Sequence, residues 1–159
     1  MRWIIIAGTF AIGLFFMSYA ACGKGNSVDS ISSDTTNIND TTTRIMKIKI
    51  GSVVFQASLL DNASARAFQS LLPLTLNMTE LNGNEKYFDL STNLPVNAAN
   101  PGTISSGDLM LWGNKTLVLF YKSFSTSYSY TKLGVIDDPK GLAEAVGSGN
   151  VTITFEMNK

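Results

Sequence analysis

One segment of the chain, between Lys122 and Lys132, concentrates the residue types that contact ligands. Serine, threonine and tyrosine hydroxyls crowd it, and such groups both donate and accept hydrogen bonds. Aromatic rings in the same segment offer flat apolar faces. We expect this segment to be a loop that lines a groove for a peptide, a sugar or an anionic ligand. The candidate ligand contacts in or near it are Trp112, Lys122, Ser123, Ser125, Tyr128 and Tyr130.

A structural role for these residues stays open as the alternative. Loop serines commonly satisfy neighbouring backbone groups, and loop tyrosines commonly pack on the sheet beside them. Trp112, which precedes Gly113, is either a stacking platform for a ligand or a core residue at the end of a strand. If a groove forms, we expect it between this loop and the proline- and asparagine-containing segment 91–106.

Acidic residues suggest a second kind of chemistry, because a glycosidase needs two carboxyl groups close together in a cleft. Asp137 and Asp138 are adjacent, but they directly precede Pro139, where an acidic side chain is expected to cap a helix. The remaining candidates are scattered over a predicted strand–turn–strand, and we interpret them as solvated charges. These candidates are Glu80, Glu85 and Asp89.

Composition excludes several classes of function. The chain has no histidine and one cysteine, so His-based triads, Cys–His pairs and nearly all zinc, copper and haem sites are excluded. The 12 basic and 12 acidic residues balance, and no basic stripe indicates nucleic-acid binding. No calcium-binding loop motif is present. We therefore expect no metal and no cofactor, and a hard-cation site made of carboxylates stays open as the alternative.

The single cysteine, Cys22, follows an apolar run near the N-terminus. Arg2, the run Trp3–Phe16 and the small residues before Cys22 have the three-part form of a secretory signal. The run is shorter than the roughly 20 residues that cross a bilayer as a helix. An uncleaved anchor, or a signal whose cysteine is incidental, remains the alternative.

The sequence Tyr19-Ala20-Ala21-Cys22 resembles the bacterial lipobox, in which small residues precede an invariant cysteine. Tyr19 departs from the aliphatic residue usual at that place. The resemblance implies cleavage before Cys22 and lipid attachment to it, which would anchor the protein to a membrane of the bacterial cell envelope (the outer membrane where there are two). Several acyl chains on one residue would make the attachment effectively permanent.

Three regions follow from these observations: a lipoprotein signal peptide at 1–21, a flexible tether at 22–43 and one domain at 44–159. The tether is polar, hydroxyl-rich and without aromatic residues, so it cannot bury enough apolar surface to fold. The domain is long enough for a single hydrophobic core.

The domain is predicted to be mainly β. Alternating or β-rich runs indicate strands at 45–50, 53–59, 74–81, 85–90, 109–112, 116–121, 133–136 and 151–155. We expect helices at 61–72, capped by Asp61 or Asn62, and at 137–146. About eight short strands and two short helices favour a closed β-barrel, with the first and last strands paired so that two edges disappear.

This order of elements resembles the cyclophilin-like barrels, in particular a small bacterial and archaeal family of unassigned function. The matching stretches are LLPLTL (71–76), GNEKYF (83–88), NPGT (100–103), GDLMLWG (107–113), LFYKSFSTSYSY (119–130) and GVIDD (134–138). The resemblance implies a barrel capped by two helices. True cyclophilins use an arginine, with aromatic residues and a histidine, to twist a prolyl amide. This chain offers Lys86 on the corresponding strand, and lysine lacks the planar guanidinium. The resemblance therefore carries no catalytic residue over to this chain.

Three hypotheses of function result. The first is a membrane-tethered, non-catalytic binding module of the cell envelope, with a peptide or small molecule as ligand. The second is an envelope peptidyl-prolyl isomerase or folding factor. The third is an enzyme that works with carboxylates alone.

Overall fold

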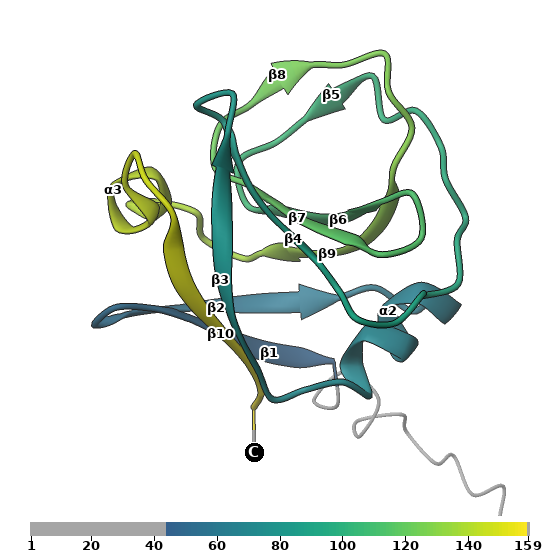
Figure 1. The fold of residues 1–159 in the computed structure, drawn as a ribbon, viewed down its shortest axis with the longest axis horizontal. Helices are drawn as coiled ribbons and strands as arrows, with labels where there is room; N and C mark the ends of the chain where they lie inside the picture. Colours follow the sequence, from purple (N-terminus) through teal and green to yellow (C-terminus); the bar gives the residue numbers. More distant parts are fainter. Residues whose placement is uncertain (1–43, 159) are drawn as a thin grey trace, which may run out of the picture. The chain divides into compact units, whose positions relative to one another are not determined.

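Pairing between the first and last strands closes a barrel in the computed structural model, which describes residues 44–158 (Figure 1). The barrel has eight antiparallel strands in the order β1-β10-β3-β4-β7-β6-β9-β2. In β1, Met46 lies opposite Met157 of β10, and Ile50 lies opposite Ile153. The predicted barrel and the predicted closure are confirmed. The barrel strands are β1 (Ile45–Ile50), β2 (Val53–Leu59), β3 (Leu74–Leu81), β4 (Glu85–Asp89), β6 (Asp108–Trp112), β7 (Thr116–Phe120), β9 (Thr131–Ile136) and β10 (Val151–Met157).

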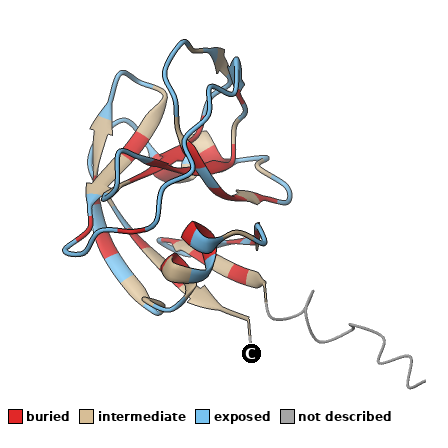
Figure 2. Ribbon diagram, turned by 90° about the vertical axis from the view of Figure 1, so that its right-hand side faces the viewer, coloured by how far each residue is buried: buried red, intermediate tan, exposed pale blue. Residues whose placement is uncertain are grey.

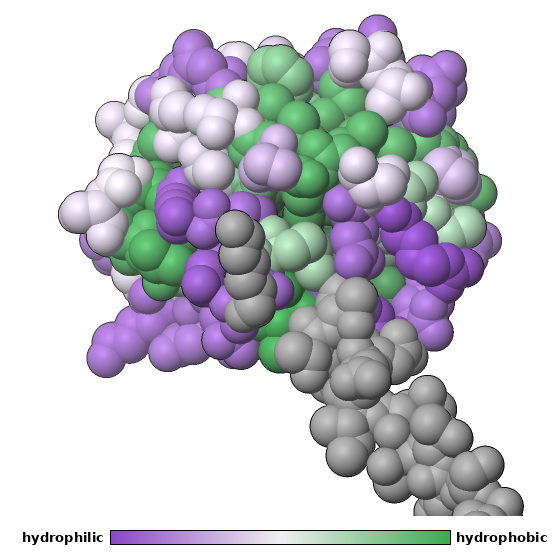
Figure 3. Space-filling view, turned by 90° about the horizontal axis from the view of Figure 1, so that it is seen from below, coloured by the Kyte–Doolittle hydropathy of each residue, from purple (hydrophilic) through white to green (hydrophobic). Residues whose placement is uncertain are grey.

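Alternation of side chains fills the barrel with a hydrophobic core. Figure 2 marks the buried positions along the ribbon. In β1, Met46, Ile48 and Ile50 are buried, whereas Lys47 and Lys49 between them are partly exposed. Hydrophobic and hydrophilic side chains are interspersed on the face at the β1 and α2 end of the domain (Figure 3). No helix in residues 44–158 is long and apolar enough to cross a membrane.

Helix α2 (Ala63–Gln69) is shorter than predicted, but its cap is as expected. The Asn62 side chain accepts a hydrogen bond of 2.8 Å from the backbone N–H of Ala65. Ala65 and Phe68 of this helix are buried, and the Phe68 ring meets that of Phe155 edge-on, with centroids 5.9 Å apart. Residues after the helix continue as turns.

Helix α3 (Leu142–Val146) begins later than predicted. The prediction that Asp137 or Asp138 caps this helix is therefore wrong, because Gly141 is the residue at its N-cap. The backbone N–H of Asp137 donates to the carbonyl oxygen of Gln56 on β2, at 3.0 Å, so Asp137 is tied to the barrel instead of starting the helix. The Asp137 carboxylate accepts from the Ser58 hydroxyl at 2.8 Å. Gly141 precedes the helix and makes no side-chain cap.

The two long loops of the sequence are joined to one another. Their strands β5 (Thr103–Ile104) and β8 (Phe124–Ser125) form a separate two-stranded sheet, seen at the top of Figure 1. A bridge between Ala99 and Tyr130 adds a second connection. The two loops therefore form one layer outside the barrel.

Candidate functional site

The outer face of three neighbouring strands, β4, β7 and β6, forms the floor of the candidate site. Side chains alternate along β4, so Glu85, Tyr87 and Asp89 share this outer face. Tyr87 lies opposite Val118 of β7, and Val118 lies opposite Met110 of β6. The floor thus has an apolar centre with a carboxylate toward each end of β4.

Residues 124–130, which we call the flap, lie over this floor. The rings of Phe124 and Tyr130 contact the fully buried ring of Phe120, with centroid distances of 5.7 and 5.4 Å. Ile104 of β5 is fully buried in the same cluster, which is separate from the core inside the barrel. Apolar packing therefore holds both ends of the flap against the barrel wall.

A cavity of about 600 Å³ lies between the floor and the flap. This volume is in the range of roughly 300–1,000 Å³ typical of small-molecule sites. Trp112 and Tyr128 line it although they are 55% and 66% exposed, which is unusual for rings of this size. The lining residues are Leu81, Asn82, Asn84, Glu85, Tyr87, Asp89, Trp112, Thr116, Val118, Phe124, Ser125, Thr126, Ser127, Tyr128 and Tyr130.

The charged groups of this lining are all acidic. Burial, and then the charge of Glu80, raises the pKa of Glu85 above its ordinary value. Burial likewise raises the pKa of Tyr130, with the charge of Glu85 as the next cause. Asp89 accepts a hydrogen bond of 2.6 Å from the Thr116 hydroxyl. The cavity therefore combines aromatic surface with negative potential.

Four of the six predicted ligand contacts line the cavity, namely Trp112, Ser125, Tyr128 and Tyr130. Lys122 and Ser123 do not. The Lys122 ammonium lies 5.8 Å from the centre of the Tyr121 ring, and the Ser123 hydroxyl oxygen accepts from the backbone N–H of Ser106 at 2.9 Å. Whether the four contact a ligand stays a prediction.

A smaller cavity of about 360 Å³ lies where the groove between the two loops was predicted, with lining residues from both of them. Lys132 at its edge pairs with the buried carboxylate of Asp108 at 2.7 Å. The larger cavity is on the β4 side of the flap instead. Sequence reasoning missed Glu85, Tyr87 and Asp89 as cavity residues, although alternation along β4 already placed them on one face.

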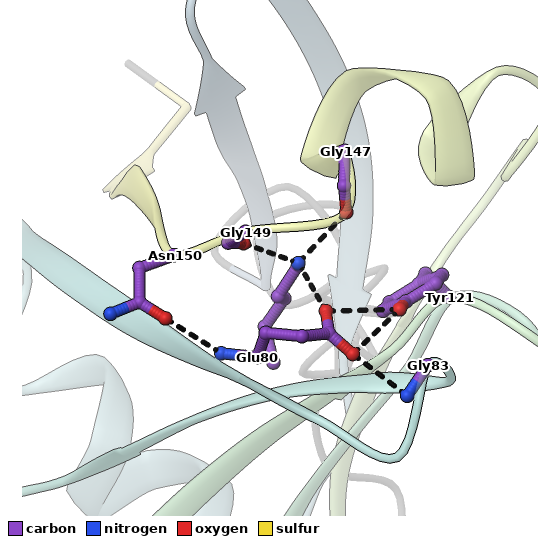
Figure 4. A network of polar contacts seen from close by, with 7 residues as sticks. Glu80, Gly83, Tyr121, Gly147, Gly149 and Asn150 are labelled. Carbon is purple, nitrogen blue, oxygen red and sulfur yellow. Dashed lines mark hydrogen bonds and ion pairs between the residues drawn. The ribbon is translucent and has the colours of Figure 1, made fainter.

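A second polar cluster at the inner side of the β3–β4 hairpin joins Glu80 to Lys86. Figure 4 shows Glu80 with its partners Gly83 and Tyr121. Lys86 is fully buried. Its ammonium donates to the carbonyl oxygens of Gly147 and Gly149, at 2.9 and 2.6 Å, and to the Glu80 carboxylate. These three bonds use every donor of the ammonium group and tie the segment between α3 and β10 to the barrel.

The Glu80 carboxylate is equally well partnered. It also accepts from the backbone N–H of Gly83 at 2.8 Å and from the Tyr121 hydroxyl at 2.9 Å. Burial raises the pKa of Glu80, but the hydrogen bonds from Lys86, Tyr121 and Gly83 outweigh it, so this pKa lies below its ordinary value. Burial and the bond to Glu80 raise the pKa of Tyr121 to about 12. The described contacts use all three ammonium donors and the phenol donor of this cluster, and they join β3, β4 and the segment after α3.

A family model described as the cyclophilin-like family matches residues 48–156. The chain belongs to this family. Its cyclophilin-like barrel is also similar to the solution structure of a hypothetical protein from Archaeoglobus fulgidus, with a TM-score of 0.57 and 17% sequence identity. That match covers 74% of this chain and 97% of the archaeal one, and at this identity it shows the fold alone. No functionally curated protein matches the sequence.

No arginine of residues 44–158 lies at the cavity, unlike the arginine of true cyclophilins. Arg44 lies 3.3 Å from the Asp61 carboxylate, and Arg66 donates to the same carboxylate at 2.5 Å. Neither arginine lines the cavity. Lys86, the cation on β4, points to the opposite side of that strand.

Proposed function

We propose that this protein is a non-catalytic, cyclophilin-like binding module of the bacterial cell envelope, held at a membrane by lipid on Cys22. The observation that carries the binding role is the cavity between floor and flap. Of seven large apolar side chains exposed in residues 44–158, three line it: Leu81, Trp112 and Tyr128. Apolar groups gathered around one cavity typically mark a ligand site.

The anchoring role rests on the sequence alone, because Cys22, the signal and the tether lie outside the described residues. Changing Cys22 to Ser removes the sulfur that would carry the lipid. We expect the C22S protein to leave the membrane fraction or to accumulate as an uncleaved precursor. Normal processing together with retention in the membrane fraction would contradict this anchor.

A prolyl isomerase is the alternative in the same family, and the chemistry of the cavity argues against it. Twisting a prolyl amide is helped by a donor with several N–H groups, such as a guanidinium. No arginine or lysine lines the cavity in the described part of the chain, and the chain has no histidine. An assay on a proline-containing peptide tests this point: a clear rate enhancement would replace the proposal with the isomerase.

A carboxylate-only glycosidase has weaker support from the geometry. Glu85 and Asp89 are the two carboxylates of the cavity, and they are four residues apart on one strand. At a rise of roughly 3.3 Å per residue their Cα atoms lie about 13 Å apart. Catalytic carboxyl groups of glycosidases lie about 5–9.5 Å apart.

The binding role is tested by a fragment screen on the full-length protein, followed by amide NMR shifts. We expect the shifts to gather on β4, β7 and the flap. The substitution Tyr128→Ala should weaken binding because it removes an exposed wall of the cavity, and Val54→Ala is the matched control, since Val54 is also exposed but lies away from the cavity. Hits that map elsewhere, or a screen without hits, would overturn the binding role of this cavity.

A further inference from the structure

The charge of the cavity lining indicates which ligands it can hold. Five rings line the cavity, together with two carboxylates, and no lysine or arginine does so within residues 44–158. The rings belong to Tyr87, Trp112, Phe124, Tyr128 and Tyr130. Aromatic faces carry a negative quadrupole, so they attract a cation as the carboxylates do. Both kinds of lining group repel an anion.

Four lysines lie near the lining residues in sequence, and none of them lines the cavity. Lys115, which precedes Thr116, is exposed. Lys86 is buried on the inner side of β4, where Glu80 and two backbone carbonyl groups hold its ammonium. Lys122 lies against the Tyr121 ring, and Lys132 pairs with Asp108. A cation that enters the cavity therefore meets no competing positive group in its lining.

Glu85 is the carboxylate best placed to receive such a cation. No ion pair joins Glu85 to any side chain in residues 44–158. The rings of Tyr87, two residues along the same strand, and of Tyr130 line the same cavity. Burial, and then the charge of Glu80, raises the pKa of Glu85, and a cation bound beside the carboxylate would offset both causes. The amide oxygen of Asn84, beside it, is buried without a hydrogen-bond partner, so one more acceptor is free for an N–H donor.

We propose that the cavity selects small organic cations, in which an ammonium or guanidinium group is joined to an apolar body. The cationic group is placed against Glu85, with Asn84 as a second acceptor, and the apolar body lies among the rings. This inference rests on the proposed function, because it names the ligand class of the same cavity. It also replaces the anionic ligand among the alternatives that the sequence suggested, since both lysines of that segment lie outside the cavity lining.

Three probes of nearly equal shape and different charge test the inference: phenethylamine as cation, phenethyl alcohol as neutral molecule and 3-phenylpropionate as anion. Binding to the full-length protein at neutral pH and low salt is measured by calorimetry and by amide NMR shifts. We expect the amine to bind at least tenfold more tightly than the other two, and its affinity to fall as salt is added.

The variant Glu85→Gln keeps the shape of the side chain and removes its charge. We expect it to lower the amine affinity about tenfold and to leave the alcohol affinity unchanged. Glu144→Gln is the matched control, because Glu144 is an exposed glutamate on α3 outside the cavity lining; it should change neither affinity.

The outcomes separate this inference from the proposed function. If the alcohol or the anion binds in the cavity as tightly as the amine, cation selectivity is overturned and the binding role stands. Equal amine affinity in the wild type and in Glu85→Gln overturns the role of Glu85. If none of the three probes shifts cavity amides, the inference is overturned, and the fragment screen alone decides the binding role.

Discussion

Two glutamates of the same β-hairpin have opposite environments. Glu80 lies on the inner side, where an ammonium, a phenol and a backbone N–H all donate to its carboxylate. Glu85, across the turn, lies on the outer side in a cavity lined by aromatic rings and has no cationic partner in the described part of the chain. The first has a lowered pKa and the second a raised one.

The difference shows how to distinguish a structural charge from one that is available for binding. A carboxylate whose acceptor sites are all used stabilises the fold and has nothing left for a ligand. A carboxylate that is partly buried without a cation makes the folded state less favourable, and a bound cation relieves that cost. Four substitutions test this comparison.

The largest expected effect is on the inner cluster, from Lys86→Met. Removing the ammonium leaves Glu80 and two carbonyl groups without their donor, and breaking a buried ion pair in this way costs about 3–5 kcal/mol. Urea unfolding followed by circular dichroism measures it. The double variant Lys86→Met/Glu80→Gln should recover part of the loss, and Lys122→Met is an exposed control. A nearly unchanged single variant would contradict the structural role.

Glu80→Gln should destabilise less, by about 1.5–3 kcal/mol at pH 7, because the amide keeps one acceptor for its former donors. The folded pKa of Glu80 lies below its ordinary value of 4.5, so its stabilisation is present above that value and is lost as pH falls through the folded pKa. The difference between wild type and variant should therefore shrink below pH 4.5. A difference that stays constant with pH would show that the charge is unimportant.

Tyr121→Phe removes one neutral donor to Glu80 and should cost about 1 kcal/mol. The same phenol gives a spectroscopic test, because its pKa is about 12. In an ultraviolet titration, the wild type minus the Tyr121→Phe variant should show one tyrosine that ionises near that value. In the Glu80→Gln background the midpoint should move toward the ordinary value of about 10. An unmoved midpoint would contradict the coupling.

Glu85→Gln should have the smallest effect on stability and the opposite sign, a gain of less than about 1 kcal/mol at pH 7. The folded pKa of Glu85 is raised, so the folded state holds this proton more tightly, and stability from this group is lost as pH rises through the unfolded and then the folded pKa. The gain should vanish at low pH, where the carboxyl is protonated in both states. A clear loss of stability at pH 7 would mean that Glu85 is structural as well.

Local patterns were sufficient for much of the fold. Alternation of apolar and polar residues predicted the barrel strands, and the Asn82-Gly83 turn formed with φ values of 57° and 70°, which suit these residues. The cap at Asn62 was also predicted, because a side chain that bonds three residues away is a local event. The predicted start of α3 was wrong. Asp137 bonds to Gln56 of β2 instead, and a contact between such distant parts of the chain is not visible in a local pattern.

The sequence by itself determined the family, the strands, the absence of histidine chemistry and the prediction of a lipid on Cys22, since each depends on residue identity or near neighbours. Only the tertiary structure decided which of the two glutamates is satisfied. Nothing in the sequence around Glu80 and Glu85 separates them. The pairing of β4 with β3 and β7 places Glu80 beside Lys86 and Glu85 in the cavity under the flap. The burial of a charge depends on what the rest of the chain places over it.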